Sequence, residues 1–576
     1  MADDLETLLG RIAASSRRKP PLHLVGTKRF ELRQKLGGGA FGEVYDARDR
    51  EHGTRVALKA LKSSQPEWVY RFKREFRTTA DLAHPNLVRL YELFSEGDSW
   101  YLTMELIEGV AFDRFVLHAP ERLKSCFVQL ALGIRELHRV GCLHRDLKPS
   151  NVLVEATGRV VLLDYGLAIN KRSQHDSAIA GTPPYMAPEL GMRWSPSEAS
   201  DWYAFGVMLY QCLTGVMPFT GSEREMLARK TAGPPPDPTT VVADCNPELA
   251  ALAMRRLSRN PHDRPGADEV LRVLGADDSE VNLGGDAAIK LAGRERELAE
   301  LEAALAESRN GPVVVTLRGP PGMGKTSLVH AFADAARGRG ARVYHGRCLE
   351  LESVPFKGVD AAIDMLCADL KREREVTLTD AAPGGAAALT QMFPVLKRVD
   401  AFARLRDSEL SPRNPHERRQ LGTRALRELL CRLSSDRPLI VFIDDLQWGD
   451  DDGVRLLLEL LAPPAPSMLM IAAYRDGAAG TAPPLVQFID GVRERGCTHR
   501  ELELGVLDRA AIAELLAVTP TAQLSEDDAL RESGGHPYLL SRLLEGGAQA
   551  GASGDVAVLL AGEIEQLEAD ARRLLE

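Results

Sequence analysis

The sequence lacks the features that would place it in a membrane, outside the cell or on nucleic acid. It contains no run of about 18 consecutive apolar residues, and Met1 is followed by acidic residues instead of a basic and then apolar leader. The formal net charge is −10, which leaves no basic field for phosphate backbones. We therefore expect a cytoplasmic protein with neither a membrane nor a nucleic-acid partner.

Cysteine is scarce, and its spacing is irregular. The eight cysteines include no Cys-x-x-Cys pair, which argues against both a zinc site and a disulfide framework. We expect reduced and mostly buried thiols.

The length predicts several domains, since 576 residues exceed what one core organises. Leucines at helical spacing over 4–14 predict a short helix in an N-terminal extension. An acidic, Gly-containing stretch without periodicity divides the remainder into two larger units. The predicted segments are the extension (1–28), a first domain (29–275), a linker (276–292), a second domain (293–545) and a final helical segment (546–576).

A glycine-rich loop opens the first domain, in the segment LGGGAFGEV. Glycines allow a backbone to pass close over phosphates without a Cβ in the way. Lys59 follows in the apolar strand-like VALKAL, where a charge is costly to bury without partners. Phosphates and Glu75, in the helical stretch RFKREFRTTADL, are its expected partners. The loop residues are Leu36, Gly37, Gly38, Gly39, Ala40, Phe41, Gly42, Glu43 and Val44.

The string CLHRDLKPSNVLV carries the most specific chemistry of the chain. Asp146 is suited to accept a substrate's hydroxyl proton, Lys148 to neutralise a transferring phosphoryl group, and Asn151 to hold a metal ion. Thirteen residues beyond Asn151, Asp164 opens DYG after an apolar run. Two oxygen ligands on separate loops suit Mg²⁺.

With GTPPYMAPE at 181–189, these motifs resemble the eukaryotic-type Ser/Thr protein kinases over residues 30–275. The resemblance implies a bilobal fold and ATP beneath the glycine-rich loop. Adenine would meet the hinge at Glu105 to Ile107, with Met104 as gatekeeper and Ala57 over the base. Lys148 and Thr182 resemble the Ser/Thr branch of the family.

Several further positions match the kinase pattern without being counted as chemistry. A Glu189–Arg264 ion pair and a carboxylate at Asp201 that braces the catalytic loop are expected. Tyr165 departs from the usual Phe of the metal motif.

Arg145 before the catalytic Asp146 accompanies, in such kinases, activation by a phosphate on the following segment. Ser173, Ser177 and Thr182 are its hydroxyls. We expect autophosphorylation at Ser173 or Ser177, because Thr182 is expected to contact the catalytic loop.

The second domain carries a phosphate-binding loop, GPPGMGKT, between the strand-like PVVVTL and a helical stretch. Backbone N–H groups would hold phosphates, Lys325 would reach the β and γ positions, and Thr326 would bind Mg²⁺. Asp444 and Asp445 end an apolar strand, where acids coordinate Mg²⁺ or orient water. The glycines of the loop are Gly319, Gly322 and Gly324.

Apolar runs at 313–317, 439–443 and 468–473 alternate with helical stretches, which predicts a mostly parallel α/β sheet. With the GRERELAELEAAL, VPFKGVD, FIDDLQWGD and GGHPYLL segments, the region resembles the signal-transduction ATPases with numerous domains. That resemblance implies a nucleotide-driven switch, with Arg475 as a γ-phosphate sensor and Pro537 near the base in a helical lid. It also implies that the chain could associate with copies of itself through this module. The chain's end resembles the start of a helical or winged-helix segment, so a C-terminal region is expected to be missing.

The sequence thus predicts a multidomain protein with an α+β bilobal kinase followed by an α/β P-loop domain, using ATP at two sites with Mg²⁺. The leading hypothesis is a Ser/Thr kinase acting on protein substrates and coupled to the second module. Two alternatives remain. One is a signalling scaffold that binds ATP chiefly to recruit partners, which the intact Lys59 and Asp146 argue against. The other is a DNA-binding regulator, which lacks a basic recognition surface.

Overall fold

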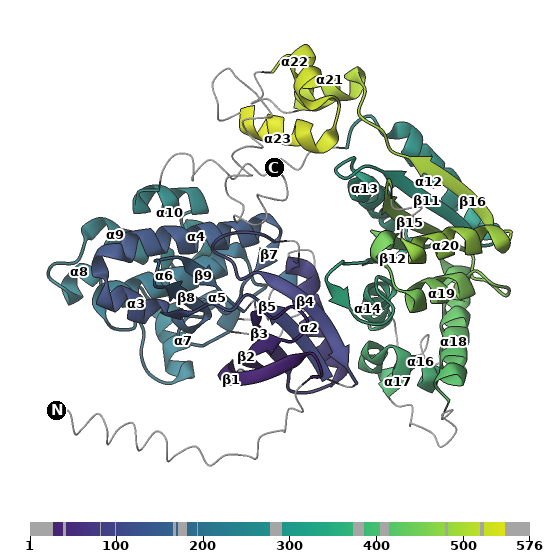
Figure 1. Ribbon diagram of the computed structural model, residues 1–576. Coiled ribbons are helices and arrows are strands. Elements are labelled where there is room, and N and C mark those ends of the chain that lie inside the picture. The colour runs from purple at the N-terminus through teal and green to yellow at the C-terminus, as the bar shows by residue number, and fades with distance from the viewer. Residues whose placement is uncertain are drawn as a thin grey trace.

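The computed structural model comprises two large units, the first of two lobes (Figure 1). Residues 29–107 form the small lobe and 108–276 the large lobe. Residues 291–547 form the second unit, called here the P-loop unit. The predicted fold class, a bilobal α+β unit followed by an α/β P-loop domain, is confirmed. The structure describes residues 27–38, 42–80, 82–97, 99–164, 169–170, 181–192, 194–276, 291–372, 385–403, 414–477, 482–518 and 524–547.

The small lobe is an antiparallel sheet backed by one helix, α2 (Pro66–Thr79). Pro66 in the first turn is preorganised for helix, and Glu67 complements the positive end of the helix dipole. Phe72 and Phe76 of α2 are buried. The sheet runs in the order β1-β2-β3-β5-β4, with β1 (Phe30–Gly38), β2 (Gly42–Asp49), β3 (Arg55–Leu61), β4 (Leu90–Glu96) and β5 (Ser99–Met104).

The large lobe is mainly helical, around α4 (Leu123–Arg139) and α6 (Glu198–Thr214). Its core includes Phe127, whose ring meets Phe112 and Phe205 edge to face at 4.9 and 5.2 Å. The remaining helices are α3 (Phe112–His118), α5 (Pro188–Gly191), α7 (Glu223–Ala232), α8 (Pro238–Val241), α9 (Pro247–Arg256), α10 (Ala267–Leu274), η1 (Pro120–Arg122), η2 (Pro149–Asn151) and η3 (Pro261–Asp263). The short strands are β6 (Gly109–Ala111), β7 (Cys142–Leu143), β8 (Val152–Glu155), β9 (Val160–Leu162) and β10 (Ile169–Asn170).

The predicted ion pair between Glu189 and Arg264 is present and buried. Two guanidinium nitrogens donate to the two carboxylate oxygens at 2.7 and 2.8 Å. The side chains are 2% and 0% exposed. This pair joins α5, next to the catalytic cleft, to the far end of the large lobe.

Replacing Arg264 with alanine is expected to destabilise the kinase part by about 3–5 kcal/mol, because Glu189 is left as an unpaired buried charge. Urea unfolding followed by tryptophan fluorescence measures the loss. Arg255→Ala is the matched control, since its ion pair with Glu269 is largely exposed and should be worth less than about 1 kcal/mol. Equal midpoints for the two variants would contradict the prediction.

The P-loop unit is built on a five-stranded sheet in the order β12-β14-β15-β11-β16. Every pairing in it is parallel. The three predicted apolar strands are confirmed as β11 (Val313–Gly319), β14 (Leu439–Asp444) and β15 (Met468–Arg475). Two strands were not predicted, β12 (Arg342–Arg347) and β16 (Thr498–Glu503), because charged and polar residues interrupt their apolar pattern.

Helices cover both faces of this sheet and continue beyond it at the C-terminal side (Figure 1). They are α12 (Glu295–Glu307), α13 (Lys325–Gly338), α14 (Val359–Leu370), α16 (Ala386–Met392), α17 (Asp400–Ala403), α18 (Pro415–Asp436), α19 (Asp451–Leu460), α20 (Pro483–Glu494), α21 (Arg509–Val518), α22 (Glu526–Ser533) and α23 (Pro537–Gly547), with η4 (Ser308–Asn310), η5 (Pro394–Arg398) and η6 (Leu446–Trp448).

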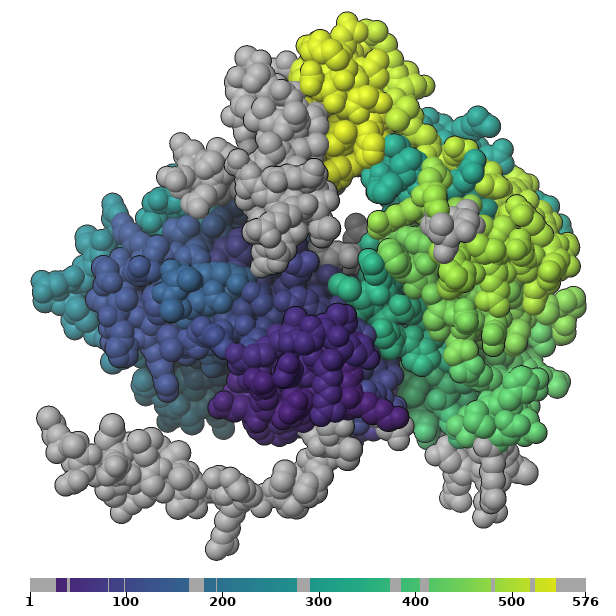
Figure 2. Space-filling view, in the orientation of Figure 1, coloured from purple at the N-terminus to yellow at the C-terminus, as the bar shows by residue number. Residues whose placement is uncertain are grey.

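A short strand of the P-loop unit joins the sheet of the small lobe. This strand, β13 (Glu352–Ser353), pairs in parallel with β4 at Leu93 and Phe94. Helix α14 lies beside α2 (Figure 1), and Figure 2 shows the small lobe in contact with the P-loop unit along one side. The two ATP-site candidates therefore belong to units that share a sheet.

Some predictions fall outside the described residues. These are the helix over 4–14, most of the linker and nearly all of the final segment. Within the part of the chain that the structure describes, no helix has the length and hydrophobicity to cross a bilayer.

Candidate functional site

Lys59 lies buried in the middle of β3 and joins two carboxylates of the cleft. Its Nζ donates to Glu75 of α2 at 2.8 Å and to Asp164 at 2.6 Å. Burial favours loss of the proton, but Asp164 and Glu75 outweigh it and raise the pKa of Lys59, so the amine stays charged. In turn, the charge of Lys59 lowers the pKa of Asp164. The predicted Lys59–Glu75 pair is thus present, and Asp164 is kept ionised.

The catalytic-loop residues meet around the carboxylate of Asp146. Lys148 Nζ donates to one oxygen of Asp146 at 2.6 Å, and the Thr182 hydroxyl donates to the other at 2.7 Å. Lys148 also donates to Thr182 Oγ1 at 2.9 Å. The Asn151 amide donates to the Asp146 carbonyl at 2.8 Å. An acid, a cation and a hydroxyl are thereby held together at one point of the cleft.

Asp201 of α6 holds this loop from behind, as expected from the sequence. Its carboxylate accepts the backbone N–H groups of His144 and Arg145, each at 2.8 Å, and contacts His138 Nε2 at 2.8 Å. Arg145 and Asp164 both adopt positive φ, 68° and 59°. Such strained backbone persists only where surrounding bonds fix it, and it gathers at functional sites.

Asn151 and Asp164 offer oxygen donors that fit Mg²⁺. The Asn151 amide nitrogen is used by the Asp146 carbonyl, which leaves its amide oxygen as the ligand atom. Lys59 contacts one carboxylate oxygen of Asp164, and the Asp164 side chain is 48% exposed. One carboxylate and one amide oxygen match the hard ligands that Mg²⁺ prefers.

The nucleotide-facing positions predicted from the kinase resemblance lie around β2, β3 and β5. Ala57 pairs with Met104 across β3 and β5, so the expected adenine cap and gatekeeper are neighbours. A Cβ at Gly42 would stand 2.7 Å from the Ala60 carbonyl oxygen, so only glycine fits there. Glu105 of the expected hinge pairs with Arg159 at 2.6 Å.

Part of the predicted kinase site falls outside the described residues. Gly39, Ala40 and Phe41 of the glycine-rich loop, Tyr165, Ser173 and Ser177 are among these. Leu36, Gly37, Gly38, Glu43 and Val44 lie on β1 and β2, and Ile107, the last residue of the expected hinge, is buried.

Lys230 was not anticipated from the sequence. Its Nζ donates to the backbone carbonyls of Pro183, Pro184 and Met186, at 2.9, 2.9 and 2.7 Å. It thereby shapes the segment that follows Thr182, beside the catalytic loop. No sequence signal marks it, because a lone lysine in a polar helix is ordinary.

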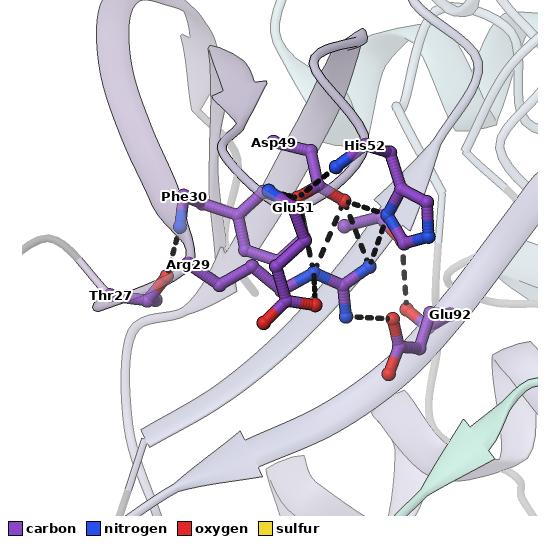
Figure 3. A network of polar contacts seen from close by, with 8 residues as sticks. Thr27, Arg29, Phe30, Asp49, Glu51, His52 and Glu92 are labelled. Atoms are coloured by element: carbon purple, nitrogen blue, oxygen red, sulfur yellow. Dashed lines mark hydrogen bonds and ion pairs between the residues drawn. The ribbon is translucent and has the colours of Figure 1, made fainter.

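A separate carboxylate cluster on the small lobe is structural. Asp49, Glu51 and His52 lie close enough together to resemble a metal site (Figure 3). Arg29, however, donates to both Asp49 oxygens, at 2.8 Å to the nearer, and to Glu92 at 2.7 Å. Burial alone would raise the pKa of Asp49, but the hydrogen bonds from Arg29 and His52 have the larger effect, so the pKa is lowered. The guanidinium supplies the positive charge that these acids need.

The P-loop motif folds as a turn that begins α13. Gly322 and Gly324 adopt positive φ, 75° and 83°, which glycine allows at little cost. Lys325 is the first residue of α13, and its Nζ donates to the carbonyls of Gly319 and Pro320 at 2.6 and 2.9 Å. The Thr326 hydroxyl donates to Asp444 at 2.7 Å. Burial lowers the pKa of Lys325 and raises that of Asp444.

Asp445 and Arg475 meet at the end of the sheet. Asp445 accepts from Arg347 at 2.9 Å, from Gln447 at 2.8 Å and from Arg475 at 3.4 Å. Burial alone would raise the pKa of Asp445, but the hydrogen bonds and charges of these donors have the larger effect, so the pKa is lowered. Arg347 and Gln447 were not predicted, since Arg347 matches no motif and Gln447, in the FIDDLQWGD segment, was assigned no role.

The C-terminal helices reach the P-loop. The Tyr538 N–H donates to the Gly322 carbonyl at 3.2 Å, and His536 Nε2 lies 3.1 Å from the Pro321 carbonyl. Pro537 begins α23 between them. The start of α23 therefore lies against the phosphate loop.

Comparisons with known proteins agree with this geometry. Residues 30–273 match the protein kinase domain family, and residues 290–471 match the AAA ATPase domain family. The chain is 33% identical over 288 residues to the serine/threonine-protein kinase PknD of Chlamydia trachomatis, covering 42% of this chain and 31% of PknD. It is 34% identical over 266 residues to the serine/threonine-protein kinase PknA of Mycobacterium tuberculosis, covering 42% of this chain and 61% of PknA. The chain thus spans about a third of PknD and three fifths of PknA, and it contains a protein kinase domain, similar to those of bacterial Ser/Thr kinases, followed by an AAA ATPase domain.

Proposed function

We propose that the chain is an ATP-dependent protein kinase that transfers the γ-phosphoryl group to Ser and Thr hydroxyls of proteins, itself included. The observation that carries this proposal is that the side chains of the cleft contact one another in two groups. Lys59 contacts both Glu75 and Asp164, while Asp146, Lys148 and Thr182 hydrogen-bond to one another. A cleft of this kind needs only positioned substrates to work, because phosphoryl transfer is catalysed mainly by positioning and charge.

Each side chain has a role that its contacts support. Asp146 accepts the proton of the substrate hydroxyl, and Lys148 offsets charge on the phosphoryl group as it moves. Lys59, steadied by Glu75, holds the nucleotide phosphates. Mg²⁺, held by Asn151 and Asp164, supplies charge neutralisation to the phosphates when bound. ATP and Mg²⁺ are abundant in the cytoplasm, which favours that compartment.

The Ser/Thr assignment rests on Lys148 and Thr182, which meet at Asp146. It agrees with the names of the two relatives. Since the Thr182 hydroxyl is engaged by both Asp146 and Lys148, Ser173 and Ser177 are the better candidates for autophosphorylation.

We further propose that the P-loop unit binds ATP with Mg²⁺ and regulates the kinase as a nucleotide-dependent switch, with self-association as a second effect. The proposal is supported by the side chains gathered at the phosphate loop: Lys325 donates to the Gly319 carbonyl, the Thr326 hydroxyl donates to Asp444, and Arg475 donates to Asp445. A switch works because the nucleotide binds one of two conformations more tightly than the other, so this proposal does not depend on hydrolysis of the bound ATP.

The experiment compares wild-type protein with Asp164→Asn, which removes the carboxylate ligand of Mg²⁺. Both are incubated with Mg-ATP and a basic Ser/Thr peptide, and phosphopeptides are mapped by mass spectrometry. Phosphoserine or phosphothreonine with wild type alone supports the proposal, and phosphate at Ser173 or Ser177 supports autophosphorylation there. No transfer by a wild-type protein that binds ATP would instead favour a signalling scaffold.

A further inference from the structure

Helix α2 presents a row of side chains to the P-loop unit. Lys73 Nζ donates to Asp360 of α14 at 2.6 Å and lies 3.4 Å from Asp364. Arg77 donates to Asp360 at 2.6 Å, to Asp364 at 2.9 Å and to Glu352 of β13 at 2.5 Å. Three acids of one unit therefore enclose two cations of the other.

This network is buried, unlike an ordinary surface contact between domains. Glu352 is 0% exposed, Lys73 3%, and Asp360 and Asp364 8% each. Buried charges are tolerated only when they are paired. A shift of α2 that kept these groups buried but broke their pairs would leave unpaired buried charges, so the network favours one position of the helix.

The other end of α2 is held as well. Arg398 of η5 pairs with Glu67 and places its guanidinium 4.0 Å from the centre of the Tyr70 ring. Contacts at both ends leave α2 little freedom to tilt or shift along its axis.

The opposite face of α2 carries Glu75, which meets Lys59 at 2.8 Å. Residues 73 and 77 lie one helical turn apart, and position 75 lies about 200° around the axis from position 73. The helix is therefore fixed by the P-loop unit on one side and completes the kinase site on the other. The Lys59–Glu75 and Lys59–Asp164 contacts are present in this docked arrangement.

Residues 347–357 of the P-loop unit, called here the docking segment, begin at the second nucleotide site. This segment leaves β12 and returns beside it at Gly358. The two backbones approach so closely there that a Cβ at Gly346 would stand 1.7 Å from the Gly358 carbonyl oxygen. One end is held by the strand end of Asp444 and Asp445, through Cys348 N–H to the Asp444 carbonyl at 2.9 Å and Arg347 to Asp445 at 2.9 Å.

The other end of the segment is held by the same acidic stretch of chain. Asp450 accepts the backbone N–H groups of Phe356 and Lys357 at 2.9 and 2.7 Å. Between the two ends, Leu349 and Val354 pack into the kinase core, and the Leu93 N–H donates to the Leu351 carbonyl at 3.1 Å. The strand end that carries Asp444 and Asp445 is thus a few residues from the sheet of the small lobe.

We propose that Glu352, Asp360 and Asp364 are positioning residues for the kinase reaction, because they hold α2 where Glu75 meets Lys59. The proposal rests on the proposed kinase function and specifies its regulation. The acidic strand end at the second nucleotide site acts on the kinase cleft through residues 347–364 and α2.

A pH effect on docking follows from the charges of the network. Asp364 faces Lys73 and Arg77 of α2, Glu352 of β13 and, on its own helix, Asp360. Burial and Asp360 raise the pKa of Asp364 to about 6. A carboxyl whose pKa is raised on docking binds more protons when docked. Docking is therefore favoured as the pH falls from 7.5 through 6, and this contribution is lost as the pH rises.

From pH 7.5 to 5.5 the equilibrium should therefore shift toward the docked state. Hydrogen exchange of residues 66–79, corrected for the intrinsic rate at each pH, measures it. Asp364→Asn should remove the dependence, and protection that weakens toward pH 5.5 would contradict it.

The proposal itself is tested with Arg77→Gln, which keeps the length of the side chain but removes the charge shared by three acids. The expected result is a kcat for peptide phosphorylation lowered about 5- to 150-fold, the usual range of coupling between sites. The KM for peptide should stay unchanged, and hydrogen exchange over residues 66–79 should rise. Arg77→Lys should recover part of the loss, and Arg48→Gln, at an exposed arginine of β2, should behave as wild type.

An unchanged or increased kcat in folded Arg77→Gln, as judged by its melting temperature, would overturn the proposal. Failure of the proposed function looks different, because the wild-type protein would then transfer no phosphate at all. Exchange over residues 66–79 does not depend on phosphoryl transfer. Faster exchange in Arg77→Gln would still support the docking in that case, and equal exchange would overturn it.

Discussion

Asp146→Asn is expected to lower kcat for phosphoryl transfer by at least about 10²-fold, because the amide cannot accept the proton of the substrate hydroxyl. Its shape is nearly that of the carboxylate, and its one amide oxygen can accept from either Lys148 or Thr182, which in the wild type donate to different carboxylate oxygens. ATP binding should persist, since Lys59, Glu75 and Asp164 are untouched. Steady-state kinetics with a peptide substrate and calorimetry with ATP separate the two quantities.

Asp237→Asn is the matched control for this substitution. Asp237 is exposed and caps α8 by accepting the Thr239 N–H at 2.9 Å, a role that asparagine fills equally well. The same chemical change there should leave kcat as in wild type. A kcat in Asp146→Asn within about threefold of that control would refute Asp146 as the proton acceptor.

The kinase site was largely predictable from the sequence because its chemistry is encoded at short range. Asp146, Lys148 and Asn151 lie within six residues of one another, and Asp164 follows a short apolar strand. Such spacing fixes which side chains share a loop. What spacing cannot give is the support behind the loop, and Lys230 holds its three carbonyls from a helix whose sequence is unremarkable.

Strand prediction in the P-loop unit succeeded where the strands are continuously apolar. Runs such as LIVFID identify a strand buried on both faces. Strand β12, with the sequence RVYHGR, also reaches the candidate nucleotide site, because Arg347 at its end contacts Asp445. Its charged ends find partners that lie far away in the chain, so hydrophobicity alone could not reveal it.

The interface between the two units could not be predicted from sequence. Lys73 and Asp360 are 287 residues apart, and each stands in a helix that carries polar residues at several other positions. Glu352 follows the acidic Glu350, which is exposed, and nothing in the local sequence distinguishes the two. Only the fold shows that one of these glutamates is buried against Arg77.

Lys325→Ala is expected to abolish nucleotide binding in the P-loop unit while leaving the kinase ATP site intact. The lysine is the one side chain of the loop that can carry charge to the β and γ phosphates. Calorimetric titration with a non-hydrolysable ATP analogue should show about two bound nucleotides per wild-type chain and about one per variant chain. Arg339→Ala, at the exposed far end of α13, is the control and should bind as wild type. Two nucleotides on Lys325→Ala would refute the assignment of the loop.

The same variant tests whether the second nucleotide reaches the kinase through α2. If it does, Lys325→Ala should change kcat by about 5-fold or more at saturating ATP. In the Arg77→Gln background, where α2 is released from its acids, that change should largely disappear, since both substitutions then act on one connection. Equal effects of Lys325→Ala in both backgrounds would mean that the nucleotide acts by another route. An effect confined to the docked background would locate the coupling in residues 347–364, between Asp445 and Arg77.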